Sequence, residues 1–286
     1  MDKISNIVEQ QYIPHLVAFI DTIGYKAKFE PLKQNRQVVE LDVEEVNRVK
    51  QEKVFITEFY DTFISVLDDK EIIGSFGMKR MLFSDNVLLA IPINYANNNF
   101  RSLNDLIIPI DLIHKMFAVI SALQLRCLAR GWLIRGALDL EYLFLNDSFV
   151  AGRGLLETYQ LEQEAKSPRV ILGNNIRNYI MKTLKMRDFY SLDKDSVENE
   201  INQSYLIDRE PDKTYLNCYQ FLKEMKKNPK HKEYYQSVQD QIQKVLEQNY
   251  RENKNNATHR ERAEFLINNF NEFVLPIEKI DVAHFL

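Results

Sequence analysis

The sequence predicts an α+β fold, in which a mixed, mostly antiparallel sheet of the ferredoxin-like or palm type carries helices packed on it. Three observations predict this class. Short apolar and β-branched runs alternate with longer segments whose apolar residues recur at helical spacing. Two of the runs flank a tight polar turn, and such hairpins belong to antiparallel sheets. The 286 residues are 45% hydrophobic and 27% charged, a composition that supports a sizeable core.

The expected elements follow from these patterns in chain order. The first strand, over residues 16–23, is an apolar run that contains Asp21 near its end and precedes Gly24. After a polar stretch from 26 to 53, the remaining expected elements are a helix over 54–67, a hairpin over 77–93, a helix over 109–130, a strand over 132–145, a helix over 152–166, a strand over 169–172, a hairpin within 204–222 and two helices within 232–273. We expect one domain over 1–222, with 223–286 as a helical extension packed on it. The basic run 223–232 is expected to be a solvated loop.

Charge and composition exclude several classes of protein. Lys and Arg total 37 against 41 Asp and Glu, and this net charge of -4 argues against a protein that coats nucleic acid. No uninterrupted apolar run approaches the roughly 20 residues of a membrane-spanning helix, and the first residues lack the pattern of a secretory leader. We therefore expect a cytoplasmic protein with neither nucleic acid nor membrane as a partner. Cys127 and Cys218 lack the spacing of a zinc site and are expected to be buried thiols.

Two carboxylates stand where an expected strand or hairpin stops. Asp21 directly follows a buried apolar run, where an ionised side chain is costly unless a cation, donors or water compensates its charge. Asp85 lies in the hairpin turn Ser84-Asp85-Asn86, where a simple turn-forming role is equally open. If both side chains point at one spot, Mg²⁺ or Mn²⁺ is the expected occupant, since hard cations take oxygen ligands. Such a site serves phosphoryl or nucleotidyl chemistry.

Five segments resemble one family of enzymes. The run Phe19-Ile-Asp-Thr-Ile-Gly-Tyr25 resembles the metal-binding strand and turn of class III nucleotide cyclases, and Phe83-Ser-Asp-Asn-Val87 resembles their second-carboxylate hairpin. Residues 130–136, 152–162 and 165–171 are similar to three successive motifs of the bacterial pyrimidine cyclases of the Pycsar antiphage system. The resemblance covers residues 16–172 and implies the fold of a class III cyclase catalytic domain.

The resemblance implies a site with two divalent ions, Mn²⁺ or Mg²⁺. Asp21 and Asp85 would hold them, with the backbone carbonyl of Thr22 as a further ligand. In the family these ions activate the ribose 3'-hydroxyl and neutralise charge on the leaving pyrophosphate. The product is a 3',5'-cyclic nucleotide.

The resemblance also implies how the nucleotide is held. The turn amides of Ile23, Gly24 and Tyr25 would cradle the triphosphate, and Phe19 would pack beside the bound nucleotide. Family members pair head to tail, so the implied assembly is a homodimer whose sites lie at the interface. The cyclic product would act as a second messenger on a separate effector protein in antiphage defence.

The departures from the family bear on the substrate. Purine-specific class III cyclases present Asn and, four residues later, Arg on the helix expected at 152–166, and these positions read Leu156 and Gln160. The position of a purine-recognising Lys reads Met81 or Leu82. Both departures favour a pyrimidine substrate. The arginines that could stabilise transition-state charge instead are Arg130, Arg135, Arg153 and Arg169. Arg135, beside Gly136 in an apolar strand, is the favoured one.

Three functions therefore stand side by side. The first is a metal-dependent cyclase that converts UTP to cyclic UMP, with CTP and cyclic CMP as the alternative. The second is a non-catalytic nucleotide-binding sensor on the same fold, because the usual Asn and Arg are missing. The third is a general α+β domain in which Asp21 and Asp85 are only turn residues. Retention of both carboxylates favours the first.

Overall fold

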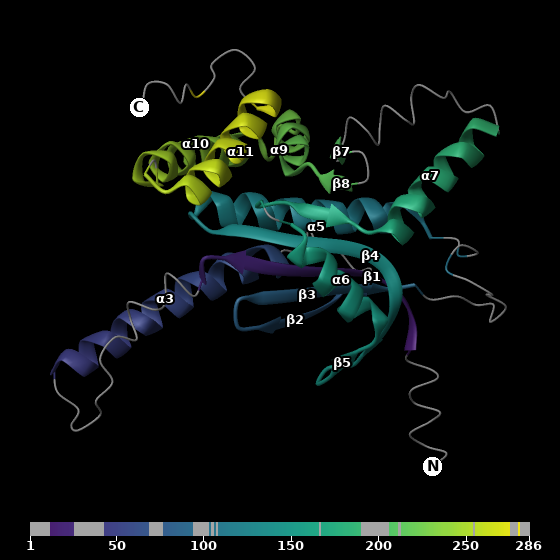
Figure 1. The fold of residues 1–286 in the computed structure, drawn as a ribbon, viewed down its shortest axis with the longest axis horizontal. Coiled ribbons are helices and arrows are strands. Elements are labelled where there is room, and N and C mark those ends of the chain that lie inside the picture. The colour runs from purple at the N-terminus through teal and green to yellow at the C-terminus, as the bar shows by residue number, and fades with distance from the viewer. Residues whose placement is uncertain are drawn as a thin grey trace.

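The computed structural model describes residues 12–25, 43–68, 77–93, 103, 106, 108–165, 167–189, 206–210, 213–253, 255–274 and 280. Its elements, labelled in Figure 1, are β1 (Tyr12–Ile23), α3 (Val43–Leu67), β2 (Lys79–Phe83), β3 (Asn86–Pro92), α5 (Ile110–Ala129), β4 (Leu133–Leu145), β5 (Val150–Ala151), α6 (Arg153–Gln163), β6 (Val170–Leu172), α7 (Asn174–Phe189), β7 (Leu206–Glu210), β8 (Lys213–Leu216), α9 (Cys218–Lys227), α10 (Lys232–Asn253) and α11 (Ala257–Phe273).

One sheet organises the molecule, with strand order β2-β3-β1-β4-β6-β8-β7 and β5 paired to β4. The pairing of β4 with β6 is parallel, and the other pairings are antiparallel. The apolar and β-branched sequence of β1 suits its place in the sheet, where its residues from Pro14 to Ile20 are buried. The predicted α+β class, with a mixed and mostly antiparallel sheet, is confirmed.

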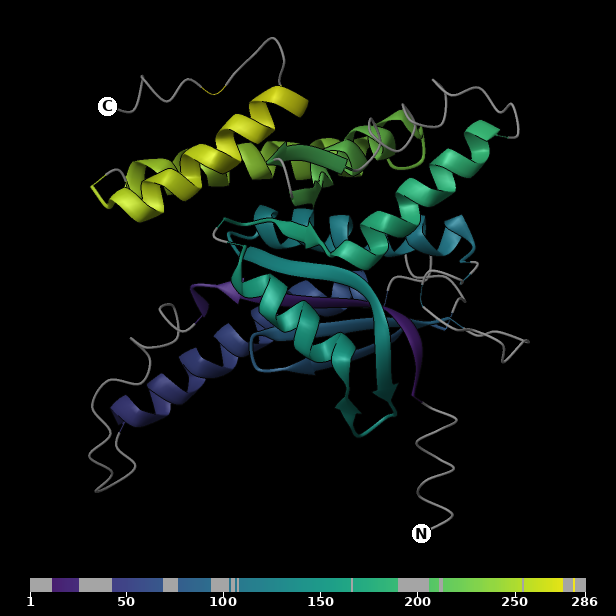
Figure 2. The ribbon, with the colours of Figure 1, turned by 45° about the vertical axis from the view of Figure 1, so that its right-hand side comes forward.

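Alternate residues of β1 serve the two faces of the sheet. Leu16, Ala18 and Ile20 belong to the large core that includes α3 and α5. Val17 and Phe19 belong to a smaller cluster on the other face, against which α6 packs. Figure 2 shows α6 crossing this second face while α5 lies behind the sheet. The sheet therefore has one face covered by a large core with α3 and α5, and another face covered by the smaller cluster and α6.

The C-terminal helices add a layer beyond α5. α9 and α10 pack on α5, and α11 packs on α9 and α10, so the same apolar core runs from the sheet to Phe270 (Figure 1). The helical hairpin expected within 232–273 is confirmed. The expected domain boundary at 222 falls within α9 and remains a prediction.

α5 is the central helix of the structure. By length and composition it could cross a membrane, with a mean hydropathy of 1.4, but 67% of that stretch is buried inside the fold. Charged residues such as Asp111, Lys115 and Arg126 interrupt its apolar sequence. Its apolar character is explained by contacts with the sheet on one side and with α9 and α10 on the other.

Several element boundaries differ from the expectation. α3 begins at Val43 within the stretch expected to be merely polar, because its charged residues are good helix formers even where the helix is exposed. The last hairpin ends at Leu216, and residues 218–227 form α9, so part of the basic run 223–232 is helical rather than loop. α7 was not predicted, although Ile176 and Ile180 lie at helical spacing and are both buried.

Asp139 joins β4 to the first turn of α7. Its Oδ1 accepts hydrogen bonds from the backbone N–H groups of Leu140 at 2.8 Å and Ile176 at 2.9 Å. Burial, with a smaller contribution from the charge of Glu141, raises the pKa of Asp139 to about 6 against the opposing effect of these hydrogen bonds. The buried carboxylate therefore accepts a backbone N–H group in the first turn of α7, and its raised pKa lets it take up a proton easily.

The Asp139→Asn variant should show a different dependence of stability on pH. The pKa of Asp139 is raised to about 6 in the folded protein, whereas that of an ordinary aspartate is 3.8. This group therefore favours folding below about pH 4, and its contribution is lost as the pH rises through 6. The difference in unfolding free energy between the variant and the parent chain should therefore shift in favour of the variant by roughly 2–3 kcal/mol as the pH rises from 4 to 7. Urea denaturation at a series of pH values measures this.

The matched control is Asp147→Asn, because that side chain is 99% exposed. Its stability curve should run parallel to that of the parent chain. If the Asp139→Asn curve were also parallel, the raised pKa would be wrong.

Candidate active site

The structure brings the two predicted carboxylates to one edge of the sheet. Asp21 pairs with Asn86 in the β1–β3 ladder, which places it beside the turn that carries Asp85. The backbone N–H of Thr22 donates to the carbonyl oxygen of Asp85 at 3.1 Å. Burial raises the pKa of Asp21, and the charge of Asp85 raises it further, while Arg135 opposes both effects. The two acids are therefore close enough for the charge of Asp85 to act on Asp21.

The turn between β2 and β3 explains how Asp85 is presented. The hairpin closes between Phe83 and Asn86, so only Ser84 and Asp85 form the loop. Ser84 has φ of 57°, in the left-handed region that a non-glycine residue adopts rarely. Its small side chain suits this position. Asn86 donates from its side-chain amide to Asp85 Oδ1 at 3.3 Å.

Arg135 is the cation of this site. It lies opposite Asp21 in the β1–β4 ladder, so both side chains are on the same face. Its Nε and Nη2 donate to Asp21 Oδ2 at 3.2 and 3.1 Å. The side chains are 23% and 17% exposed, which leaves each of them a limited opening to solvent. This contact singles out Arg135 among the four arginines that the sequence offered.

The other three arginines lie elsewhere. Arg130 donates from Nη1 to Thr62 Oγ1 at 3.0 Å, which ties the end of α5 to α3. The guanidinium of Arg169 lies 3.8 Å from the centre of the Tyr215 ring. Arg153 is exposed at the start of α6. These positions favour structural or solvated roles for all three.

Glu162 is a member of the site that sequence reasoning missed. Its side chain is 0% exposed, and its Oε1 lies 2.5 Å from Nε of Arg135. This contact is an ion pair without hydrogen-bond geometry, while the other carboxylate oxygen accepts from the side-chain amide of Gln163. Burial raises the pKa of Glu162 against the lowering effect of Arg135. A signal was available, because Glu162 falls at helical spacing from the buried Thr158, on the inward face of α6.

The charges at this edge of the sheet do not balance. Among the described residues, Asp21 and Glu162 share the guanidinium of Arg135, and the charge of Asp85 acts on Asp21 as well. The described residues contain no cluster of three or more His, Cys, Asp or Glu side chains with metal-ligand geometry. The two accessible acids, Asp21 and Asp85, nonetheless supply the hard oxygen donors that Mg²⁺ and Mn²⁺ prefer, together with an excess of negative charge. The residues present therefore fit a divalent cation.

The turn after β1 has the geometry of a tight backbone loop. Gly24 has φ of 81°, and a side chain there would be strained although space is open around it. Tyr25 packs away from this turn, with its ring centroid 4.7 Å from that of Phe59 and 5.4 Å from that of Phe55. Its pKa is raised by burial and by the charge of Asp85. Ile23 is half-buried at the end of β1.

Phe19 lies deeper than its expected contact with a nucleotide requires. It is 3% exposed, and its ring is covered by Phe83 at 6.0 Å and by Tyr159 at 5.5 Å between centroids. These two covering rings are themselves 37% and 48% exposed. The aromatic surface that a ligand meets directly in this conformation is therefore Phe83 and Tyr159.

The outward face of α6 carries the departures from the cyclase pattern. Leu156 is 61% exposed, and Gln160 is exposed one turn later. Neither offers a cation. Met81, at one of the two positions aligned with a purine-recognising Lys, packs against the apolar cluster around Phe19. Leu156, Gln160 and Met81 thus leave these three positions without a charged side chain.

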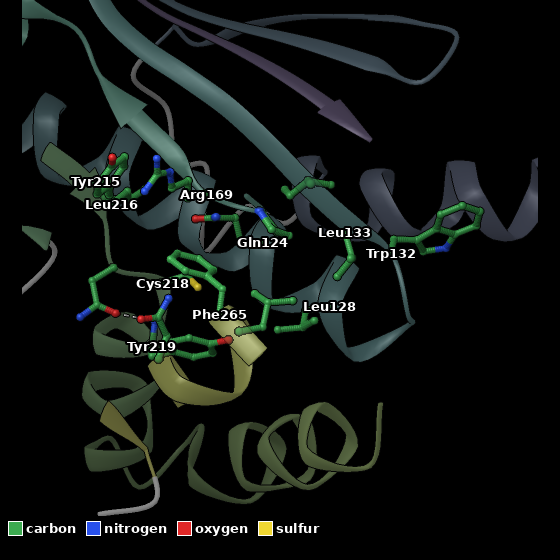
Figure 3. Close-up of a pocket in the computed structure, with 15 residues that line it drawn as sticks. Gln124, Leu128, Trp132, Leu133, Arg169, Tyr215, Leu216, Cys218, Tyr219 and Phe265 are labelled. Atoms are coloured by element: carbon green, nitrogen blue, oxygen red, sulfur yellow. Dashed lines mark hydrogen bonds between the residues drawn. The ribbon is translucent and has the colours of Figure 1, made fainter. Parts of the chain in front are cut away.

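A separate cavity of about 40 Å³ lies between the start of β4 and the helices α5, α9 and α11 (Figure 3). Shielded polar atoms of Gln124, Tyr219 and Asn269 line it and have no hydrogen-bond partner among the described residues. Burial raises the pKa of the Tyr219 hydroxyl, which therefore stays protonated. Space of this size holds about three water molecules, enough to satisfy these atoms and too little for a nucleotide.

No family model matches the chain, and no curated protein matches it. Two cyclases are among the solved structures that resemble it weakly. The adenylyl cyclase CyaB from P. aeruginosa shares 12% identity at a TM-score of 0.31, over 71% of this chain and 91% of that one. The guanylyl cyclase Cya2 shares 9% identity at a TM-score of 0.33, over 71% and 89%. Likeness at this level assigns no activity to the chain.

Proposed function

We propose that this protein is a metal-dependent nucleotide cyclase that converts UTP to cyclic UMP and pyrophosphate, with CTP as the alternative substrate. One observation supports the proposal: Asp21 lies in the ladder beside the turn that carries Asp85, far away in the chain, and it pairs with Arg135. Two acids with one guanidinium are the groups that metal-assisted phosphoryl chemistry needs. A purely turn-forming role for the acids does not explain why Asp21 is placed against a cation on a thinly covered face.

The acids would hold the metal. Asp21, Asp85 and the carbonyl of Thr22 are the proposed ligands for two Mn²⁺ or Mg²⁺ ions, which lower the pKa of the ribose 3'-hydroxyl and neutralise phosphate charge when bound. The 3'-oxygen forms its bond to the α-phosphorus as the bond to pyrophosphate breaks, and the hydroxyl proton leaves to solvent. Arg135 would stabilise the negative charge that develops on the phosphate oxygens.

The turn that follows β1 would receive the triphosphate. Ile23, Gly24 and Tyr25 would donate their backbone N–H groups to phosphate oxygens, which the left-handed conformation of Gly24 supports. Phe19 would act through the rings that cover it rather than by direct contact. The missing charged groups on α6 and at Met81 support a pyrimidine over a purine.

A homodimer with sites at the interface is part of this proposal. Leu156 and Tyr159 on α6 and Phe83 on the hairpin are large apolar side chains left substantially exposed around the site. Exposed apolar surface next to a site favours coverage by another protein surface. A role of the cyclic product in antiphage defence, through a separate effector protein, rests on the sequence resemblance alone.

A non-catalytic nucleotide sensor is the second candidate function. The observation that favours it is the exposed α6 face, where Leu156 and Gln160 stand in place of the usual Asn and Arg. A sensor would bind a nucleoside triphosphate with a metal ion and release no pyrophosphate.

The deciding experiment is an assay of the purified protein with each of the four ribonucleoside triphosphates and Mn²⁺. We expect pyrophosphate release chiefly from UTP, at least ~10-fold above ATP and GTP, and a cyclic monophosphate identified by mass spectrometry. Equal turnover of ATP would overturn the pyrimidine assignment. Binding of a triphosphate without turnover, measured by calorimetry, would instead establish the sensor.

A further inference from the structure

Arg135 is shared between two carboxylates that lie on different elements. Asp21, on β1, accepts from its Nε and Nη2, and Glu162, on α6, lies against the same Nε at 2.5 Å. The Glu162 side chain is completely buried, whereas that of Asp21 is 17% exposed. A solvent-borne ion can therefore reach Asp21 and not Glu162.

This arrangement creates a competition at Asp21. A carboxylate that pairs with a guanidinium is partly neutralised, so it is a weaker ligand for a divalent cation. If Asp21 is also a metal ligand, Arg135 needs another anion to hold it when the ion binds. Glu162 is the acid in contact with Arg135 that an incoming ion does not reach.

We propose that Glu162 is a positioning residue. When a divalent cation binds Asp21, Glu162 holds the side chain of Arg135 against α6. The guanidinium then stays beside the site without blocking the metal. This inference rests on the proposed function and adds a residue to it. With Glu162 as anchor, Arg135 can turn its Nη groups from Asp21 toward phosphate oxygens. α6, whose outward face carries Leu156 and Gln160 where the family has Asn and Arg, would thus serve the site from its inward face.

A purely structural role accounts poorly for Glu162. A buried ion pair is a costly way to fill space, because both charges lose their hydration, and apolar side chains of similar volume often do as well. Glu162 also leaves Oε1 without a hydrogen bond, so its contact with Arg135 is electrostatic rather than a packed hydrogen-bonded network. Its place opposite Asp21 across one guanidinium is the feature that needs explanation.

A double-mutant cycle on Mn²⁺ affinity tests the proposal without any turnover. Free Mn²⁺ is measured by electron paramagnetic resonance for the parent chain, Glu162→Gln, Arg135→Gln and the double variant. In the presence of Arg135, Glu162→Gln should weaken Mn²⁺ binding about tenfold or more, because the guanidinium then rests on Asp21 alone. In the Arg135→Gln background, Glu162→Gln should weaken Mn²⁺ binding by a several-fold smaller factor. Equal losses in both backgrounds would show a simple charge effect and overturn the proposal.

The matched control is Glu157→Gln, on the exposed side of the same helix, which should bind Mn²⁺ within about twofold of the parent chain. If Arg135→Gln does not fold, turnover provides the second readout. At saturating Mn²⁺ and UTP, Glu162→Gln should lower kcat about tenfold with little change in KM, and Glu162→Asp should restore part of it. Unchanged kcat in Glu162→Gln would overturn the positioning role. A parent chain inactive on all triphosphates would overturn the proposed function and leave the Mn²⁺ cycle as a separate result.

Discussion

Replacing Asp21 with asparagine should abolish turnover, with a loss of about 10³-fold or more, and leave the protein folded. Asparagine has nearly the same shape, so β1 and its ladders should persist, but it lacks the negative charge that a divalent ion requires. Burial raises the pKa of Asp21, which means that the folded protein disfavours the ionised side chain. At pH 7 the stability of the variant should therefore equal or exceed that of the parent chain. Pyrophosphate release and thermal denaturation measure the two effects.

Asp147→Asn is the control, since it removes the same charge from a fully exposed side chain and should alter neither quantity. An Asp21→Asn protein that retained turnover would remove this residue from the site. Lost activity together with a large loss of stability would indicate a structural role instead. Loss of activity without loss of stability is the signature expected of a functional acid.

Substituting alanine for Gly136 should destabilise the protein by about 3 kcal/mol, a large effect for one methyl group. A Cβ atom at this position would lie 2.6 Å from the backbone oxygen of Phe19 and 3.2 Å from Cγ1 of Ile20. Neither neighbour can retreat easily, because both belong to β1 in the centre of the sheet. Since Arg135 precedes Gly136, turnover should fall with stability. Chemical denaturation gives the change in unfolding free energy.

Gly77→Ala provides the comparison. Gly77 has φ of 70°, and a methyl group at this position would meet nothing within 4 Å, so only the backbone strain of about 1 kcal/mol is expected. If Gly136→Ala cost no more than Gly77→Ala, the close approach of β1 and β4 would be wrong.

Much of the fold was accessible from the sequence because its strands are strongly apolar and its turns carry clear signals. The run that forms β1, the hairpin around Asp85 and the glycine that ends α5 each left a local pattern. α7 was missed because its polar composition hides two buried isoleucines, and its start depends on Asp139, which is distant in sequence. The beginning of α3 was missed because exposed helix leaves little apolar periodicity.

The site was only partly predictable, for a different reason. Asp21, Asp85 and Arg135 each sit in recognisable local patterns, and the structure brings them together. Glu162 becomes significant only through its contact with Arg135, which lies on another element. The burial of Phe19 under Phe83 and Tyr159 depends likewise on packing between elements that no local pattern encodes.

The hydrogen bond from Thr22 to Asp85 limits how this protein could be regulated. It ties the hairpin turn to the end of β1, next to the ladder in which Asp21 faces Asn86. The backbones of the two acids are thus joined through one antiparallel ribbon, that of β1 and β3. Moving the two acids apart would require breaking the ladder between β1 and β3. An activator or inhibitor would therefore have to act on what approaches this ribbon, such as α6 with Glu162 or a second copy of the chain.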